Sequence, residues 1–172
     1  MESEQGDSAI EGSKPPLIGD DDLALSEFVE NMGLHYESYG VPRIGGRILG
    51  LLLVTPRPIS SEEMAEALQV SRSSISTNLR TLLLTGLVEK VSLPGERVDF
   101  FEFAEDAWEN ALQLRLADIL PLKELAEEGL EGLEPGSPGQ QRLLEMMEWA
   151  ELVNEFSQQL TLAWQSRRES TS

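Results

Sequence analysis

The chain contains no cysteine and only one histidine, His35, in 172 residues. Without cysteine it can form no disulfide, no thiolate metal site and no thiol-based redox switch. One histidine is too few for the usual histidine metal centres, and no Ser/His/Asp arrangement can be placed in the sequence. We therefore expect a protein that is not an enzyme, with no catalytic residues, metal or cofactor. His35 is interpreted as a partly buried structural residue of a helix.

Long apolar runs are also absent. The longest, Ile48 to Val54, is much shorter than the ~18 residues that a membrane-spanning helix requires, and it includes Gly50. The first residues are acidic and polar, which is not typical of a signal peptide. We therefore expect a cytoplasmic protein with no membrane partner. Apolar residues make up 40% of the chain, enough for one domain with extensions or for a small dimer subunit.

Basic residues are scarce, since 13 Lys and Arg stand against 31 Asp and Glu, and the net charge is −18. The deficit is uneven: residues 1–40 carry −9 and residues 99–172 carry −11, whereas residues 41–98 carry +2. Only this middle segment can approach a polyanion without net repulsion. A charge of +2 is small, so one copy should bind DNA weakly and with strong salt dependence, and two paired copies would compensate.

The middle segment contains the pattern of a helix-turn-helix. Ser60 and Glu63 have the spacing of a capping box that starts a first helix. Its apolar positions recur at helical spacing: Met64, Ala65 and Leu68. Ser71 is a candidate N-cap for a second helix, 71–85, which ends before Gly86. Two short helices joined by a tight turn are a common DNA-binding motif.

The second helix is predicted to have two different faces. One is apolar and consists of Ile75, Leu79, Leu82 and Leu83. The opposite face carries hydroxyl and guanidinium groups, and no carboxylate occurs from Ser71 to Gly86; its members are Arg72, Ser73, Ser76, Thr77 and Arg80. Such a surface suits a major groove, because Ser and Thr reach phosphates or bases without bulk and Arg can pair bidentately with guanine. The alternative is a solvated helix face, which usually mixes charges of both signs.

Two strand-like runs rich in Val, Phe and Leu follow, at 87–93 and 98–103, with turn residues between them. A hairpin in this position predicts a wing at 93–98, with Arg97 at a minor groove, where arginine senses groove width and negative potential. The alternative is an ordinary hairpin with one exposed arginine. The candidate DNA-contact residues are Arg72, Ser73, Ser74, Ser76, Thr77, Arg80, Arg97 and Ser60.

Helices are also predicted before and after this segment. Asp20 to Asp22 suit a helix start better than a calcium loop, and Pro42 opens a helix over Arg43–Val54. In that helix Gly45 and Gly46 indicate close helix packing rather than a phosphate loop. Arg43 and Arg47 lie one turn apart and are candidates either for phosphate contact or for ion pairs within the chain.

The C-terminal part is predicted to be helical in two stages. Pro121 should kink or split a helix that runs from Ala107 to about Glu128, and 129–139 has the composition of a linker. A long helix, from 140 to about 168, would extend ~40 Å. Its apolar residues cover more than one face, and the excess is best buried against another subunit. A helix packed only within its own chain is the alternative.

The sequence thus predicts a mainly α fold with a small β-hairpin wing: a winged helix-turn-helix domain plus long N- and C-terminal dimerisation helices. The expected divisions are a disordered acidic tail (1–19), an N-terminal dimerisation helix (20–40), a winged helix-turn-helix DNA-binding domain (41–104) and a C-terminal helical dimerisation region (105–168).

Over roughly residues 23–128 the chain resembles the GbsR branch of the MarR-type winged-helix transcriptional regulators. The opening motif of that branch is matched by Tyr39, Gly40, Pro42, Gly46, Arg47, Ile48, Gly50, Leu51 and Leu52. Its recognition-helix pattern is matched by Ser71, Arg72, Ser74, Ile75, Ser76, Thr77, Leu79, Arg80 and Leu82. The resemblance implies a repressor or similar regulator that binds double-stranded DNA as a homodimer, paired through its N- and C-terminal helices.

A regulator needs a signal, so a small-molecule effector is a candidate partner. Some members of the branch sense choline-like ligands, but that ligand is not transferred to this chain. An aromatic cage for a quaternary ammonium would draw on Tyr36, Tyr39, Trp108, Trp149 or Trp164 with nearby acids, although aromatics at helical spacing usually belong to a core. The rival function, favoured by the overall acidity, is a winged-helix module for protein–protein contact that does not bind DNA.

Overall fold

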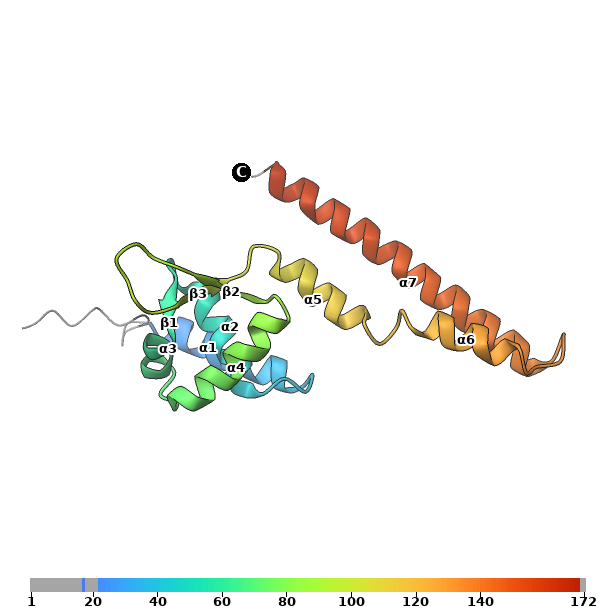
Figure 1. Ribbon diagram of the computed structural model, residues 1–172, viewed down its shortest axis with the longest axis horizontal. Helices are drawn as coiled ribbons and strands as arrows, with labels where there is room; N and C mark the ends of the chain where they lie inside the picture. The colour runs from blue at the N-terminus through green and yellow to red at the C-terminus, as the bar shows by residue number, and fades with distance from the viewer. Residues whose placement is uncertain (1–16, 18–21, 171–172) are drawn as a thin grey trace, which may run out of the picture. The chain divides into compact units, whose positions relative to one another are not determined.

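The computed structural model describes residue 17 and residues 22–170 and is shown in Figure 1. The elements follow the chain in this order: α1 (Leu23–Glu37), α2 (Arg43–Val54), β1 (Ile59–Ser60), α3 (Ser61–Ala67), α4 (Arg72–Leu84), β2 (Val88–Val91), β3 (Phe100–Phe103), α5 (Ala107–Leu116), α6 (Leu122–Leu130) and α7 (Pro138–Glu169). The mainly α fold with a small hairpin is confirmed. The tail predicted for 1–19 lies outside the described residues apart from Leu17.

The strands form one three-stranded sheet in the order β1-β3-β2. β1 runs antiparallel to β3, with Ile59 opposite Phe101 and Ser60 opposite Phe100. The sequence did not predict β1, which is two residues long and directly precedes α3. By pairing with β3, it ties the start of the helix-turn-helix to the base of the hairpin.

Helices α1 and α2 pack closely because glycine lines their contact. A Cβ added at Gly46 would lie 2.6 Å from the carbonyl oxygen of Met32 and 2.9 Å from the Cα of Gly33. The prediction that this glycine serves close helix packing is therefore confirmed. Across the same contact Glu30 pairs with two arginines of α2, Nη2 of Arg43 at 2.9 Å and Nε of Arg47 at 2.6 Å. Of the two roles considered for these arginines, ion pairing within the chain is the one observed.

The C-terminal helices follow the predicted breaks. α5 ends at Leu116 and α6 begins at Leu122, directly after Pro121, so the proline separates two helices instead of bending one. α7 is 32 residues long and is capped by Ser137, whose hydroxyl accepts a hydrogen bond from the backbone N–H of Gln140 at 3.2 Å. None of the helices in residues 22–170 has an apolar stretch long enough to cross a membrane.

The chain divides into two compact units. One contains the described residues up to Arg80 together with Lys90–Glu102, and its core includes Ile48, Leu49, Leu51, Ile59, Met64 and Ile75. The other contains Thr81–Glu89 and the described residues from Phe103 onward. Two local predictions were wrong: Leu83 is exposed rather than part of the apolar face of α4, and His35 is exposed, with its ring edge-on to Tyr36 and Tyr39.

Candidate nucleic-acid interface

Helix α4 is held by its cap and by its apolar face. The hydroxyl of Ser71 accepts a hydrogen bond from the backbone N–H of Ser74 at 3.2 Å, which satisfies one of the free donors of the first turn. Ile75, Leu79 and Leu82 are buried. The residues predicted for the opposite face are all exposed: Arg72, Ser73, Ser76, Thr77 and Arg80. Packing of the apolar face therefore leaves one continuous row of hydroxyl and guanidinium groups open to a partner.

A buried amide on α4, Asn78, was missed by the sequence analysis. Its Nδ2 donates to the carbonyl oxygen of Ser74 at 2.9 Å, and a Cβ added at Gly45 would lie 3.1 Å from its Oδ1. Asn78 therefore packs against α2 at Gly45, where a larger residue would require the amide to shift by a few tenths of an ångström. In the sequence, Asn78 is only a polar residue beside the apolar Leu79. The packing against α2 shows why an amide is buried at this position.

The turn between α3 and α4 is fixed by a second contact with α2. Nη2 of Arg47 donates to the carbonyl oxygen of Leu68 at 3.0 Å. The next residue, Gln69, has a φ of +53°, a left-handed conformation that reverses the chain without glycine. These contacts set the angle at which α4 leaves the turn, and hence the direction of its exposed row.

The first helix of the helix-turn-helix, α3, starts with the predicted capping box. The hydroxyl of Ser60 accepts from the backbone N–H of Glu63 at 3.3 Å, and Glu63 accepts from the backbone N–H of Ser60 at 2.8 Å. Ser60 and Ser74 are both half-buried, unlike the other six DNA-contact candidates. The hydroxyl of Ser60 is thus engaged in the cap, while that of Ser74 lies 2.9 Å from the hydroxyl of Ser71.

The hairpin forms where it was predicted. Figure 1 shows the loop between β2 and β3 extending beyond the paired strands. Gly95 in this loop has a φ of +84°, and Arg97 is exposed. Nζ of Lys90 lies 2.8 Å from Oδ2 of Asp99, so an ion pair joins the two sides of the loop at its base. The positive charge of Arg97 is therefore held on a short projection of the same compact unit that contains α4 up to Arg80.

The exposed row includes one ion pair that the sequence analysis did not predict. Nη2 of Arg72 pairs with Oε1 of Glu62, a residue of the first turn of α3. No carboxylate occurs on α4 itself, but the helix-turn-helix brings this one beside the first arginine of the row. The guanidinium of Arg72 is therefore partly neutralised before it meets any partner.

Sequence models of two families match this chain. The MarR family matches residues 39–97, and the MmpR5-like MarR family transcriptional regulators match residues 106–167. The chain is 40% identical over 107 residues to the HTH-type transcriptional regulator MmpR5 of Mycobacterium tuberculosis, which covers 62% of this chain and 65% of that protein. It is 25% identical over 95 residues to the HTH-type transcriptional repressor OpcR of Bacillus subtilis, covering 55% of this chain and 51% of that protein.

One solved structure extends the likeness further. It is a crystal structure of a transcriptional regulator that is 34% identical, with a TM-score of 0.62, and the match covers 81% of this chain and 99% of that one. The chain carries MarR-family winged-helix transcriptional regulator domains. It spans less than two thirds of the length of MmpR5 and about half that of OpcR.

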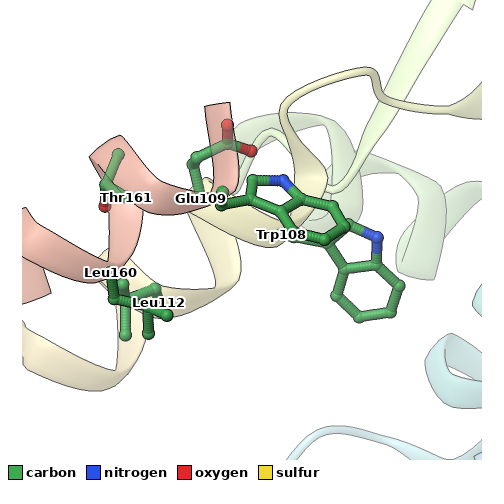
Figure 2. Close-up of a pocket in the computed structure, with 6 residues that line it drawn as sticks. Trp108, Glu109, Leu112, Leu160 and Thr161 are labelled. Atoms are coloured by element: carbon green, nitrogen blue, oxygen red, sulfur yellow. The ribbon is translucent and has the colours of Figure 1, made fainter. Parts of the chain in front are cut away.

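Helices α5 and α7 line a pocket, shown in Figure 2. Trp108, Glu109 and Leu112 come from α5, and Leu160 and Thr161 come from α7. Trp164, also of α7, completes the lining. Of the five aromatics considered for a cage, two therefore line one pocket with one acid. Tyr36, Tyr39 and Trp149 are not among the lining residues.

Proposed function

We propose that this protein is a sequence-specific regulator of transcription that binds double-stranded DNA. In this proposal the recognition helix, 71–85, enters the major groove and the wing, 93–98, lies at the minor groove. The observation that carries the proposal is that α4 has two faces: Ile75 and Leu79 are buried on one, and the row of hydroxyl and guanidinium groups is exposed on the other. Those groups can donate hydrogen bonds to phosphate oxygens and to the acceptor atoms of guanine.

The proposal includes a homodimer. On α7, Trp149 is 49% exposed, Phe156 64% and Leu162 67%, although Ala150 on the same helix is buried. Among the described residues nothing covers this apolar surface, which is more than a stable single chain usually leaves open. Pairing of two copies through α1 and α7 would bury it. It would also present two segments to the DNA at once, each with the +2 charge of residues 41–98, and so raise the number of phosphate contacts.

We further propose that the regulator acts as a repressor in the cytoplasm and belongs to the GbsR branch. The repressor role is supported by the likeness to OpcR, and the branch by the motif from Tyr39 to Leu52. The proposed division remains that of the sequence: the N-terminal helix (20–40) and the C-terminal region (105–168) dimerise, and the domain at 41–104 binds DNA.

The DNA-binding proposal is tested by titrating the protein against the promoter next to its own gene and against an unrelated fragment, at two salt concentrations. Arg72→Ala should weaken binding by about 1–3 kcal/mol at particular base pairs, because it removes a base contact. Arg97→Ala should weaken binding more evenly across sequences, because a wing arginine acts mainly through phosphate and groove potential. Arg142→Ala serves as the matched control, since this exposed arginine of α7 lies outside the winged helix.

The same titration distinguishes the proposed function from the rival one. A winged helix used only for protein contact would retain no fragment at low salt, and neither Arg72→Ala nor Arg97→Ala would change that result. Equal losses for Arg72→Ala and Arg142→Ala would also contradict the proposal, because they would show a response to net charge rather than to a contact surface.

A further inference from the structure

One carboxylate of α1 holds two arginines of α2 that differ in burial. Oε2 of Glu30 lies 2.9 Å from Nη2 of Arg43, and Oε1 lies 2.6 Å from Nε of Arg47. The side chain of Arg43 is 47% exposed, whereas that of Arg47 is 19% exposed. A cation that has lost most of its water needs an opposite charge more than an exposed cation does. Arg47 therefore depends on Glu30 more strongly than Arg43 does.

Arg47 also reaches the helix-turn-helix. Its Nη2 donates to the carbonyl oxygen of Leu68 at 3.0 Å. Leu68 is the C-cap of α3, and the carbonyl groups at the end of a helix have no partner within the helix itself. One guanidinium thus joins three helices: α1 through Glu30, α2 from which it extends, and the end of α3. All of these residues belong to the same compact unit.

A glycine of α1 leaves room for the side chain of Arg47. A Cβ added at Gly33 would lie 2.7 Å from Cγ of Arg47 and 3.0 Å from Cγ of Arg43. A larger residue at this position would therefore displace the stem that carries the guanidinium toward α3. Helix α1 places the guanidinium in two ways, through the carboxylate that attracts it and through the glycine beside its stem.

The backbone that follows Leu68 relies on such external contacts. Gln69 has a φ of +53°, which is unfavourable for a residue other than glycine and persists only when the surroundings hold it. The backbone N–H of Val70 donates to the carbonyl oxygen of Ala65 at 3.1 Å, and α4 begins at Arg72. Only a few residues separate the carbonyl that Arg47 holds from the first turn of α4, so a loose turn would loosen the direction of α4.

We propose that Arg47 is a positioning residue of the recognition helix and that Glu30 of α1 keeps its guanidinium at the Leu68 carbonyl. The consequence for DNA rests on the proposed function, whereas the effect on the turn does not. Without Glu30 the turn becomes more mobile, and α4 meets the groove in several orientations. Contacts to particular bases need one orientation, but contacts to phosphates carry no sequence information and tolerate several. The pair therefore supports specificity more than affinity in general.

Glu30→Gln on the full chain separates positioning from net charge, because the two predict opposite signs. Removal of an acid makes the chain less negative, which by itself would tighten DNA binding. Positioning predicts binding to the promoter next to its own gene that is about threefold to tenfold weaker, with less than about a twofold change for an unrelated fragment. Arg47→Met should weaken promoter binding about tenfold, because it removes the hydrogen bond itself. Fluorescence anisotropy measures both affinities.

Arg43→Met is the matched control. It removes the other arginine paired with Glu30, so it costs an ion pair of similar kind and leaves the contact between Arg47 and Leu68 in place. The ratio of promoter affinity to unrelated-fragment affinity should stay within about twofold of that of the unmodified chain. Urea unfolding of each variant corrects the affinities for the folded fraction. A merely structural role for Arg47 would lower both affinities in proportion to that fraction and leave their ratio unchanged.

Hydrogen exchange measured by mass spectrometry without DNA tests the effect on the turn directly. The backbone N–H groups of Leu68, Gln69 and Val70 are hydrogen-bonded in the turn. Glu30→Gln and Arg47→Met should raise their exchange rates about threefold or more, because the turn opens more often. The control variant should leave these rates within about twofold of those of the unmodified chain.

Three results would overturn the proposal: equal exchange rates in all three variants, an unchanged affinity ratio in Glu30→Gln, or tighter promoter binding by Glu30→Gln. If the unmodified chain prefers no fragment, the DNA-binding proposal fails. Exchange that is faster in Glu30→Gln and Arg47→Met but not in the control then still supports the role of Arg47 in the turn. The two failures are therefore distinct.

Discussion

The ion pair between Glu62 and Arg72 leads to a prediction that is opposite in sign to the usual loss-of-contact mutation. Glu62→Gln keeps the shape of the side chain and removes its charge. The two side chains are 67% and 75% exposed, so the pair contributes only about 0.2–1 kcal/mol. This is the free energy that Arg72 must give up before it can contact DNA. We therefore expect Glu62→Gln to tighten DNA binding by about 1.4- to fivefold.

A second effect acts in the same direction. The carboxylate of Glu62 stands beside the exposed row of α4 and would repel the phosphates that the row approaches. Both effects are between exposed charges, so the gain should shrink as salt is raised and the Debye length falls to about 8 Å at physiological ionic strength. The free energy of unfolding should change by less than about 0.5 kcal/mol, because the pair is exposed.

Fluorescence anisotropy with a labelled promoter fragment measures this prediction, and a double-mutant cycle separates its two causes. In an Arg72→Ala background the gain from Glu62→Gln should fall to the part due to direct repulsion. Glu66→Gln is the matched control, being an exposed acid of α3 one turn further on. Weaker binding by Glu62→Gln would refute the reasoning, since it would mean that Glu62 orients Arg72 for its contact. An equal gain from Glu66→Gln would reduce the effect to net charge.

Two further predictions concern the helices outside the helix-turn-helix. Gly46→Ala should lower the free energy of unfolding by about 1–3 kcal/mol in urea titrations, since its Cβ would lie 2.6 Å from the Met32 carbonyl oxygen. Gly45→Ala is the control and should lower it less, because the added Cβ meets side chains that can move. A smaller loss at Gly46 than at Gly45 would contradict this reasoning. Phe156→Glu should weaken the proposed dimer by about 3–6 kcal/mol, because burial of one phenylalanine is worth about 1.5–3 kcal/mol and both copies are changed. Analytical ultracentrifugation measures the dissociation constant of the dimer. An unchanged dissociation constant would show that Phe156 lies outside the dimer interface.

Features with local causes were predicted well from the sequence. The bounds of α2, Arg43–Val54, agree with the prediction because Pro42 opens the helix and an apolar run defines it. The capping box of α3 and the separation of α5 from α6 at Pro121 agree for the same kind of reason. The row on α4 was found because one helix carries both its buried and its exposed positions, three or four residues apart.

The C-terminal region shows how far a pattern extends. The sequence predicted a helix from 140 to about 168 with more apolar surface than one domain covers, and α7 spans Pro138–Glu169 with Phe156 and Leu162 exposed. Periodicity identified the helix, and its amount of apolar surface indicated a partner. Periodicity did not indicate that Trp108 of α5 would share a pocket with Trp164.

The sequence by itself determined the order of the elements, their caps and the chemistry of the exposed row, because each depends on residues within a few positions of one another. Only the tertiary structure decided that Glu62 pairs with Arg72, that β1 pairs with β3, and that Arg168 pairs with Glu105 and Glu109. Those outcomes join residues separated by ten to sixty positions, roughly, and the distance between such residues is set by packing, which no local pattern contains.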